Sequence, residues 1–269
     1  MTPLRLAALA LLLAGPALAS PLLAGPALAA DNPLQPSPAW DDLRLAVTGT
    51  ETEPMIDATI LDLDAPMRAD NPALVPIRVT QPTGAPRIEK LALVVDGNPA
   101  PVAGEFTFGP ATGPLDFEVR VRVDAYSDVR AIAWLEDGRQ VMAGRFVKAS
   151  GGCAAPAGGG AKAREGMGEM RWRSEPSGDR AMGTLMIRHP NFSGLQRDQL
   201  TLLNIPAEFV QTIEVRQGNQ LLMTMDGGIS ISENPVFRLG YVPDGGAITV
   251  HAEDTDGRQF DAGFPAAGG

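Results

Sequence analysis

The sequence predicts an all-β protein made of two β-sandwich domains joined by a glycine-rich arm, with a short helix near the start of the first. Short segments that alternate between apolar and polar residues recur on both sides of residue 150, and turn residues separate them. Between these two groups lies Ser150–Gly160, which is almost entirely glycine and alanine and therefore suits neither a core strand nor a core helix. We therefore divide the chain into residues 31–149, an arm at 150–166, and residues 167–269.

The first thirty residues are predicted to be an export signal. Arg5 is their only charge, and an apolar run follows over Leu6–Leu13. Two small-x-small ends, Ala17–Ala19 and Ala27–Ala29, both suit signal peptidase, and we favour cleavage after the second, just before Asp31. Glycine and proline interrupt the run before it reaches the roughly 20 residues that a bilayer requires. We expect a Sec-type signal and a periplasmic protein.

Composition narrows the choice of partners. The formal net charge is −10, and loss of Arg5 with the signal makes it one unit more negative. Such a chain is predicted to avoid nucleic acid and anionic membranes and to favour partners with basic faces. The sequence has one cysteine, so it can form no internal disulfide, and an oxidising compartment leaves this thiol buried, paired with another molecule or reserved for chemistry.

The first domain opens with a helix and continues with strands. Ser37 can cap the helix, Pro38 suits its first turn, and Gly49 ends it; Trp40, Leu43 and Val47 fall on one face. The clearest alternation is Phe117–Val123, and Asp137-Gly138 is a strong hairpin signal. The predicted strands of this domain are 58–61, 74–80, 88–95, 117–123, 129–135 and 140–147.

The second domain repeats the pattern. Its turns are predicted at Gly218-Asn219, 243–246 and Asp256-Gly257. The predicted strands are 182–188, 209–217, 221–225, 236–241 and 247–253. Both domains are therefore predicted to be β-sandwiches.

The only cysteine, Cys153, lies in the glycine-rich arm. Its neighbours Gly151, Gly152, Ala154, Ala155 and Pro156 offer little side chain to pack against it, so we expect an exposed thiol on a mobile arm that is covalently modified in the resting protein. A simple linker with an incidental cysteine is the alternative. Nearby cations could raise the thiolate fraction or hold an anionic adduct, although solvated surface charge is the more common role: Arg145, Lys148, Lys162 and Arg164.

Two sets of motifs resemble a known family. VVDGNPAPVAGEFTFGP, VRAIAWLEDG and FVKASGGC are similar to SoxY, the sulfur-carrier subunit of the periplasmic thiosulfate-oxidising system. IRHPNFSGLQRDQ, IPAEFVQTIEV, SISENPVFR and DTDGRQF resemble its partner subunit SoxZ. In this order they resemble the fused SoxYZ-like carriers that are associated with quinoprotein dehydrogenases.

The resemblance implies immunoglobulin-like domains and a carrier role for Cys153 without catalysis or a cofactor. It also implies partners among sulfur-oxidising enzymes and c-type cytochromes, with a quinoprotein dehydrogenase as a further candidate. The chain departs from the family pattern where it continues beyond Cys153, because a tethered loop must enter a partner's channel as two strands of chain. A clip at Gly158–Gly160 would free the arm.

Other candidate sites are weaker. His189 and His251, the only histidines, are placed near strand ends and expected to be structural. Asp254–Gly257 starts like a calcium loop but lacks its later ligands, which favours a turn. Four methionines could form a soft-metal site but more often fill a core: Met182, Met186, Met223 and Met225. We predict no metal site.

Two functions remain open. One is a sulfur carrier that uses Cys153; the other is a periplasmic accessory or assembly protein that supports a dehydrogenase through metal or protein contacts. An inaccessible Cys153 would favour the second.

Overall fold

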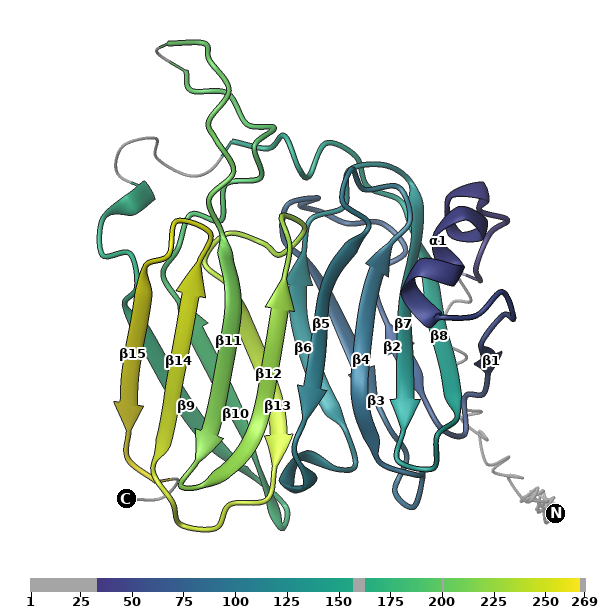
Figure 1. Ribbon diagram of the computed structural model, residues 1–269, viewed down its shortest axis with the longest axis vertical. Coiled ribbons are helices and arrows are strands. Elements are labelled where there is room, and N and C mark those ends of the chain that lie inside the picture. Colours follow the sequence, from purple (N-terminus) through teal and green to yellow (C-terminus); the bar gives the residue numbers. More distant parts are fainter. Residues whose placement is uncertain (1–32, 157–162, 200, 267–269) are drawn as a thin grey trace, which may run out of the picture. The chain divides into compact units, whose positions relative to one another are not determined.

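The computed structural model describes residues 33–156, 163–199 and 201–266 (Figure 1). All of them belong to one unit of the chain, Asn32–Gly269. The predicted export signal lies outside the described residues. Within the described ranges no helix is long and apolar enough to cross a membrane.

The described chain is mainly β-structure. In the first half the elements are α1 (Pro38–Thr48), β1 (Met55–Ile56), β2 (Asp62–Asp64), β3 (Val75–Thr80), β4 (Ile88–Val95), β5 (Val102–Phe108), the short 3-10 helix η1 (Pro110–Thr112), β6 (Asp116–Val121), β7 (Ser127–Leu135) and β8 (Gln140–Val147). In the second half they are β9 (Met170–Ser177), β10 (Arg180–Ile187), β11 (Val210–Gln217), β12 (Gln220–Gly227), β13 (Val236–Tyr241), β14 (Ile248–Asp254) and β15 (Gln259–Phe264).

The two halves share both of their sheets. One sheet has nine strands in the order β1-β8-β7-β4-β5-β12-β11-β14-β15, and the other has six in the order β2-β3-β6-β13-β10-β9. The first-half strands β5 and β6 pair antiparallel with the second-half strands β12 and β13. The predicted all-β fold of layered sheets is confirmed (Figure 1), and the same two sheets run through both halves, so that strand pairing joins the halves directly.

A common core lies between the sheets at the junction of the halves. Phe106 packs against Phe117, with ring centroids 4.8 Å apart, and against Phe237 of the second half at 6.5 Å. All three rings are buried in one hydrophobic cluster. Pairing of β5 with β12 and of β6 with β13 removes four exposed sheet edges at the same place. The halves are therefore expected to act as one body.

The predicted N-terminal helix is confirmed as α1. Ser37 Oγ accepts the Trp40 N–H at 3.3 Å, and Gly49 takes the left-handed conformation that ends the helix. Trp40 is buried on the outer side of the nine-stranded sheet, where its ring stacks on Arg130. Arg130 in turn pairs with Asp96 and Asp128, so the helix covers a buried ion-pair cluster.

One predicted strand is wrong. Residues 58–61 form a turn, because the Asp57 carbonyl accepts the Ile60 and Leu61 N–H groups while its carboxylate accepts the Thr59 N–H at 2.9 Å. The other predicted strands and the hairpin at Gly138 are present, with ends shifted by a few residues.

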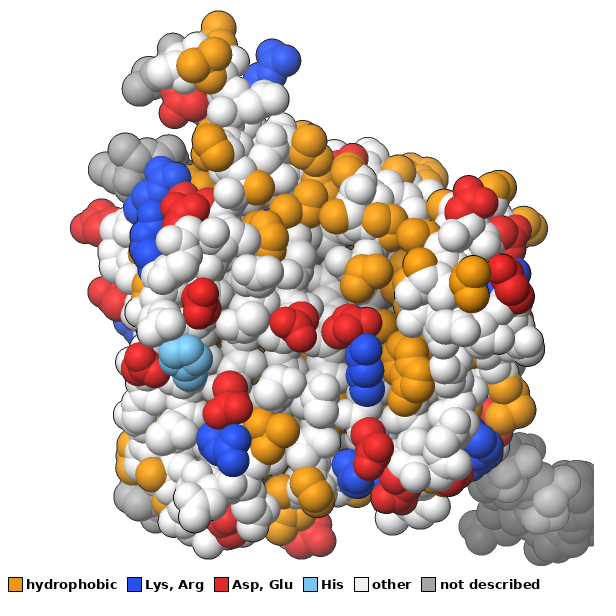
Figure 2. Space-filling model, in the orientation of Figure 1, with side chains coloured by type: hydrophobic (Ala, Val, Ile, Leu, Met, Phe, Trp, Pro, Cys, Tyr) orange, Lys and Arg blue, Asp and Glu red, His pale blue; other side chains and the backbone are white. Residues whose placement is uncertain are grey.

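The outer face of the nine-stranded sheet is mixed in charge. Figure 2 shows Asp and Glu side chains spread over it with fewer cations between them. At the junction Glu105 lies directly opposite Asp226 on β12, and Lys90 pairs with Glu105 at 2.9 Å. Lys90 therefore offsets part of the repulsion between the two acids.

Candidate functional site

Cys153 is packed inside the protein. Its side chain has no exposed surface, and it is a free cysteine. The segment that holds it follows β8, whose end is tied to the chain at Met67–Ala69 by backbone hydrogen bonds to Lys148. The prediction of an exposed thiol on a mobile arm is wrong for this conformation.

Backbone hydrogen bonds dock the cysteine segment onto the turn after β6. The Gly151 N–H donates to the Asp124 carbonyl at 2.8 Å, and the Gly152 N–H donates to the Val123 carbonyl at 3.1 Å. The Cys153 N–H donates to Asp124 Oδ1 at 3.0 Å. A Cβ on Gly152 would lie 2.2 Å from the Pro72 carbonyl oxygen. Glycine at 152 is thus what allows this close approach.

The second half supplies the other wall of the site. Ser193 Oγ donates a short hydrogen bond to the Cys153 carbonyl and accepts the Leu195 N–H at 3.2 Å. Ser193 itself is buried, and its N–H is bonded to Gln196 Oε1 at 2.9 Å. The cysteine segment is therefore held between the two halves.

A fully buried arginine lies against the same segment. Arg122 Nη1 donates to the Gly152 carbonyl at 3.2 Å, and Nη2 donates to the Asn191 carbonyl at 3.1 Å. Its Nε is buried and has no hydrogen-bond partner among the described residues. The sequence did not indicate a buried Arg122. This residue is the last charge in the alternating run Phe117–Val123, whose charged side chains were expected to face solvent.

Burial makes the Cys153 thiol a weak acid. Desolvation, and then the charge of Asp124, raise its pKa to about 11, and the positive charge of Arg122 opposes them only in part. At neutral pH the thiolate fraction is then on the order of one in ten thousand, against a few per cent for an ordinary cysteine. The docked thiol is therefore protected from reaction.

The family models account for both halves around this site. "Sulfur oxidation protein SoxY" matches residues 45–153, and "Sulphur oxidation protein SoxZ" matches residues 170–265. The chain is a fused SoxYZ-like protein. Its SoxY domain match ends on Cys153, the residue held between the two domains.

Among solved structures, the chain is similar to the "sulfur carrier protein SoxY" of Chlorobium limicola f thiosulfatophilum. The identity is 22%, the match covers 41% of this chain and 91% of that one, and the TM-score is 0.35. A Parabacteroides merdae beta-glucuronidase matches 78% of this chain at 11% identity and a TM-score of 0.25, and the match covers 24% of the enzyme. The chain matches none of the curated proteins.

Two of the four cations predicted near Cys153 have other partners in the SoxYZ-like fold. Arg145 pairs with Asp62 at 2.8 Å, and Arg164 forms a short ion pair with Glu208 of the SoxZ domain. Lys148 lies at the end of β8, and Lys162 lies outside the described residues. The cation that contacts the cysteine segment is Arg122, which the sequence did not indicate.

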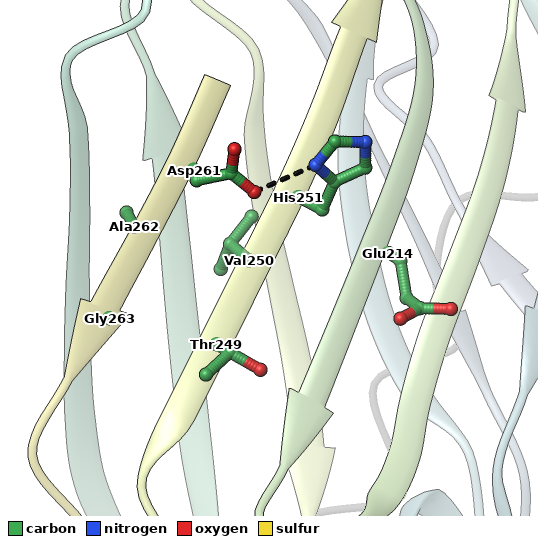
Figure 3. Close-up of a pocket in the computed structure, with 7 residues that line it drawn as sticks. All are labelled: Glu214, Thr249, Val250, His251, Asp261, Ala262 and Gly263. Atoms are coloured by element: carbon green, nitrogen blue, oxygen red, sulfur yellow. Dashed lines mark hydrogen bonds and ion pairs between the residues drawn. The ribbon is translucent and has the colours of Figure 1, made fainter. Parts of the chain in front are cut away.

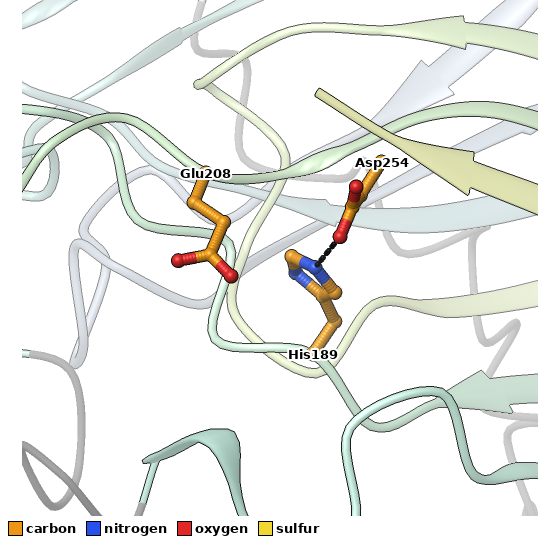
Figure 4. A group of neighbouring side chains, drawn as sticks. All are labelled: His189, Glu208 and Asp254. Carbon is orange, nitrogen blue, oxygen red and sulfur yellow. Dashed lines mark hydrogen bonds and ion pairs between the residues drawn. The ribbon is translucent and has the colours of Figure 1, made fainter. Parts of the chain in front are cut away.

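His189 lies in a buried ionic cluster of the SoxZ domain (Figure 4). Its Nδ1 accepts the Asn191 N–H at 3.1 Å, which assigns the proton to Nε2, 3.5 Å from Asp254. Burial lowers the pKa of His189, although its hydrogen bond to Asp254 acts in the opposite direction.

The carboxylates beside His189 could in principle bind a metal, because ligand atoms of His189, Glu208 and Asp254 lie within 4.8 Å of one another. Arginines already neutralise both acids: Arg164 and Arg258 pair with Glu208, and Arg258 pairs with Asp254. The cluster is thus a charge-balanced anchor, in agreement with the structural role expected for His189.

His251 occupies a surface hollow on the outer face of β14 (Figure 3). Its Nδ1 lies 2.8 Å from Asp261 on β15, and Glu214 is its cross-strand neighbour on β11. His251 lies within β14 rather than at a strand end, so that detail of the prediction is wrong. The residues that line the hollow include no cysteine or serine, and the one hydroxyl among them is that of Thr249, which has no hydrogen bond to His251 in the described part of the chain.

The remaining candidates are structural. Asp254–Gly257 forms the turn between β14 and β15, where the Gly257 N–H donates to the Asp254 carbonyl at 3.0 Å. Met223 and Met225 are buried in the core, whereas Met182 and Met186 lie on β10 in the other sheet and Met186 is exposed.

Proposed function

We propose that this SoxYZ-like protein carries intermediates of sulfur oxidation as covalent adducts on Cys153. The observation that carries the proposal is that the SoxY match, followed by a SoxZ domain, ends on the only cysteine of the chain. The carrier delivers its adduct to separate sulfur-oxidising enzymes. With residues 1–30 as an export signal, it works in the periplasm.

The chemistry requires a thiolate and an electron acceptor. With thiosulfate, a bond forms between the Cys153 sulfur and the outer sulfur of the anion, the thiol loses its proton, and two electrons pass to an acceptor on a partner. A c-type cytochrome is the class of partner suited to that step. The protein itself contributes the nucleophile and its presentation.

Burial of Cys153 makes undocking part of the proposed cycle. The segment is held by three backbone N–H donors and by contacts to two side chains, Arg122 and Ser193. These bonds can be exchanged for bonds to water, each with a modest net effect of about 1 kcal/mol on stability. A docked state that shields the thiol and an undocked state that reacts are therefore both accessible.

Tetrathionate tests the proposal without any partner. The Cys153 thiolate attacks an inner sulfur of tetrathionate, the central sulfur–sulfur bond breaks, thiosulfate leaves, and a protein thiosulfonate remains. We expect intact-mass analysis of the native protein to show one added thiosulfate group, which dithiothreitol removes. Cys153→Ser should gain none.

The buried thiol also favours a second function, that of an accessory protein whose cysteine is only structural. On that account the native protein resists tetrathionate at all times, although the same reagent labels it in urea. Such a result would overturn the carrier proposal.

A further inference from the structure

Arg122 is a buried cation that forms no ion pair with any described residue. Its side chain is among the largest that are fully buried, and none of the ion pairs between described residues includes it. Two of its nitrogens meet backbone carbonyls, and Nε meets no acceptor in the described part of the chain. A buried charge in this condition is destabilising unless an anion approaches it.

Two acidic groups act on Arg122: the carboxylate of Glu233, and the Cys153 side chain when it is ionised. Arg122 contacts the carbonyl of Gly152, one residue before the thiol. Burial lowers the pKa of Arg122, whereas the charges of Glu233 and of a Cys153 thiolate raise it, so negative charge at residue 153 stabilises the guanidinium. Asp124, on the other side, uses Oδ1 for the Cys153 N–H.

We propose that Arg122 is a positioning residue that holds the anionic end of a sulfur adduct on Cys153, through its unused Nε–H, while the segment is docked. The inference rests on the proposed carrier function and adds a selectivity to it: adducts with a negatively charged end are retained in the docked state in preference to neutral adducts. An anionic group supplies the acceptor that Nε lacks, and hydrogen bonds to charged groups are the stronger class.

A matched pair of adducts tests this inference. Tetrathionate gives the anionic thiosulfonate as described above. tert-Butyl methanethiosulfonate gives a neutral tert-butyl disulfide with a tetrahedral end of similar shape, and methanesulfinate leaves. Dithiothreitol removes either adduct: the Cys153 thiol is restored, thiosulfate or tert-butyl thiol is released, and the reductant becomes its cyclic disulfide.

The rate of this release is measured in the native protein and in urea-unfolded protein, and the unfolded rate is divided by the native rate for each adduct. This ratio is a protection factor that cancels the intrinsic reactivity of each adduct. We expect the anionic adduct to be protected roughly tenfold to a hundredfold more than the neutral one. Equal protection of the two adducts in the native protein would overturn the inference without any mutation.

Variants then assign the effect to Arg122. Arg122→Met should make the two protection factors equal. Arg122→Lys keeps the charge but lacks the guanidinium Nε, and it should reduce the difference between the two factors. It also serves as the test variant if Arg122→Met does not fold. Lys148→Met is the matched control, since it removes a cation near the segment and should leave the difference intact. An unchanged difference in Arg122→Lys would contradict the role of Nε. If neither reagent labels native Cys153, the carrier proposal itself fails, whereas labelling with equal protection rejects only the role of Arg122.

Discussion

The proposed carrier function requires Cys153 to be both shielded and available. In the docked state it has no exposed surface, and a pKa of about 11 keeps it protonated at neutral pH. Accessible thiols oxidise readily, so the docked state protects the Cys153 thiol from oxidation. Chemistry then depends on how often the segment leaves its site.

The pH dependence of alkylation reports this state. The rate of Cys153 with iodoacetamide should rise continuously toward pH 11, because the docked thiol ionises only near that value. The higher intrinsic reactivity of a more basic thiolate offsets part of the low thiolate fraction, so at neutral pH we expect a rate at least about tenfold below that of a small thiol. A rate that levels off near pH 8.5, as for an exposed cysteine, would show that the segment is mainly undocked.

The raised pKa of Cys153 also makes the stability of the folded state depend on pH. Because the folded state holds this proton more tightly than the unfolded state, the stabilisation is complete below about pH 8.5 and is lost as pH rises toward 11.

The burial of two side chains, Arg122 and Cys153, could not be predicted from the sequence. Arg122 follows Val121, and alternation alone would point its charge to solvent, yet strand β6 ends at Val121 and Arg122 turns inward. The Cys153 carbonyl is bonded to Ser193, forty residues later in the other domain. Contacts between distant segments of this kind leave no local pattern.

At the scale of elements, the docked segment can be released by one methyl group. Gly152→Ala places a Cβ 2.2 Å from the Pro72 carbonyl and 2.6 Å from the Val123 carbonyl, both of them backbone atoms. We expect the segment to undock, Cys153 to become accessible, and iodoacetamide labelling at neutral pH to speed up by at least about tenfold.

Gly151→Ala is the matched control. Its Cβ meets nothing within 4 Å, and its positive φ of 77° adds only backbone strain of about 1 kcal/mol. A labelling rate in Gly152→Ala that equals the rate in Gly151→Ala would show that close packing at residue 152 does not hold the segment.

The elements that the sequence predicted well carry their own local signals. Ser37 and Gly49 bound α1, and Asp137-Gly138 marks the hairpin between β7 and β8. The missed strands include β9 and β15, which are the outermost strands of their sheets. Both strands alternate between half-buried and exposed residues, but neither contains a fully buried residue, and edge strands tolerate residues such as Pro176 that weaken a strand prediction.

At the scale of the whole molecule, the sequence indicated two domains but not the continuity of their sheets. The pairing of β5 with β12 joins residues more than one hundred positions apart, and no local turn or capping motif in the sequence indicates it. Continuity has a functional consequence, because it fixes the SoxZ-domain residue Ser193 against the SoxY-domain cysteine. Fusion therefore provides both walls of the Cys153 site on one chain.

The most direct test of the carrier account is intact-mass analysis of the protein isolated without reductant from its own cells, grown on thiosulfate. The account predicts a sulfur-containing mass increase on a fraction of the molecules that is removed by dithiothreitol and confined to the peptide with Cys153. It also predicts that Cys153→Ser abolishes the biological activity. An unmodified Cys153 in every molecule, together with full activity of Cys153→Ser, would contradict the account.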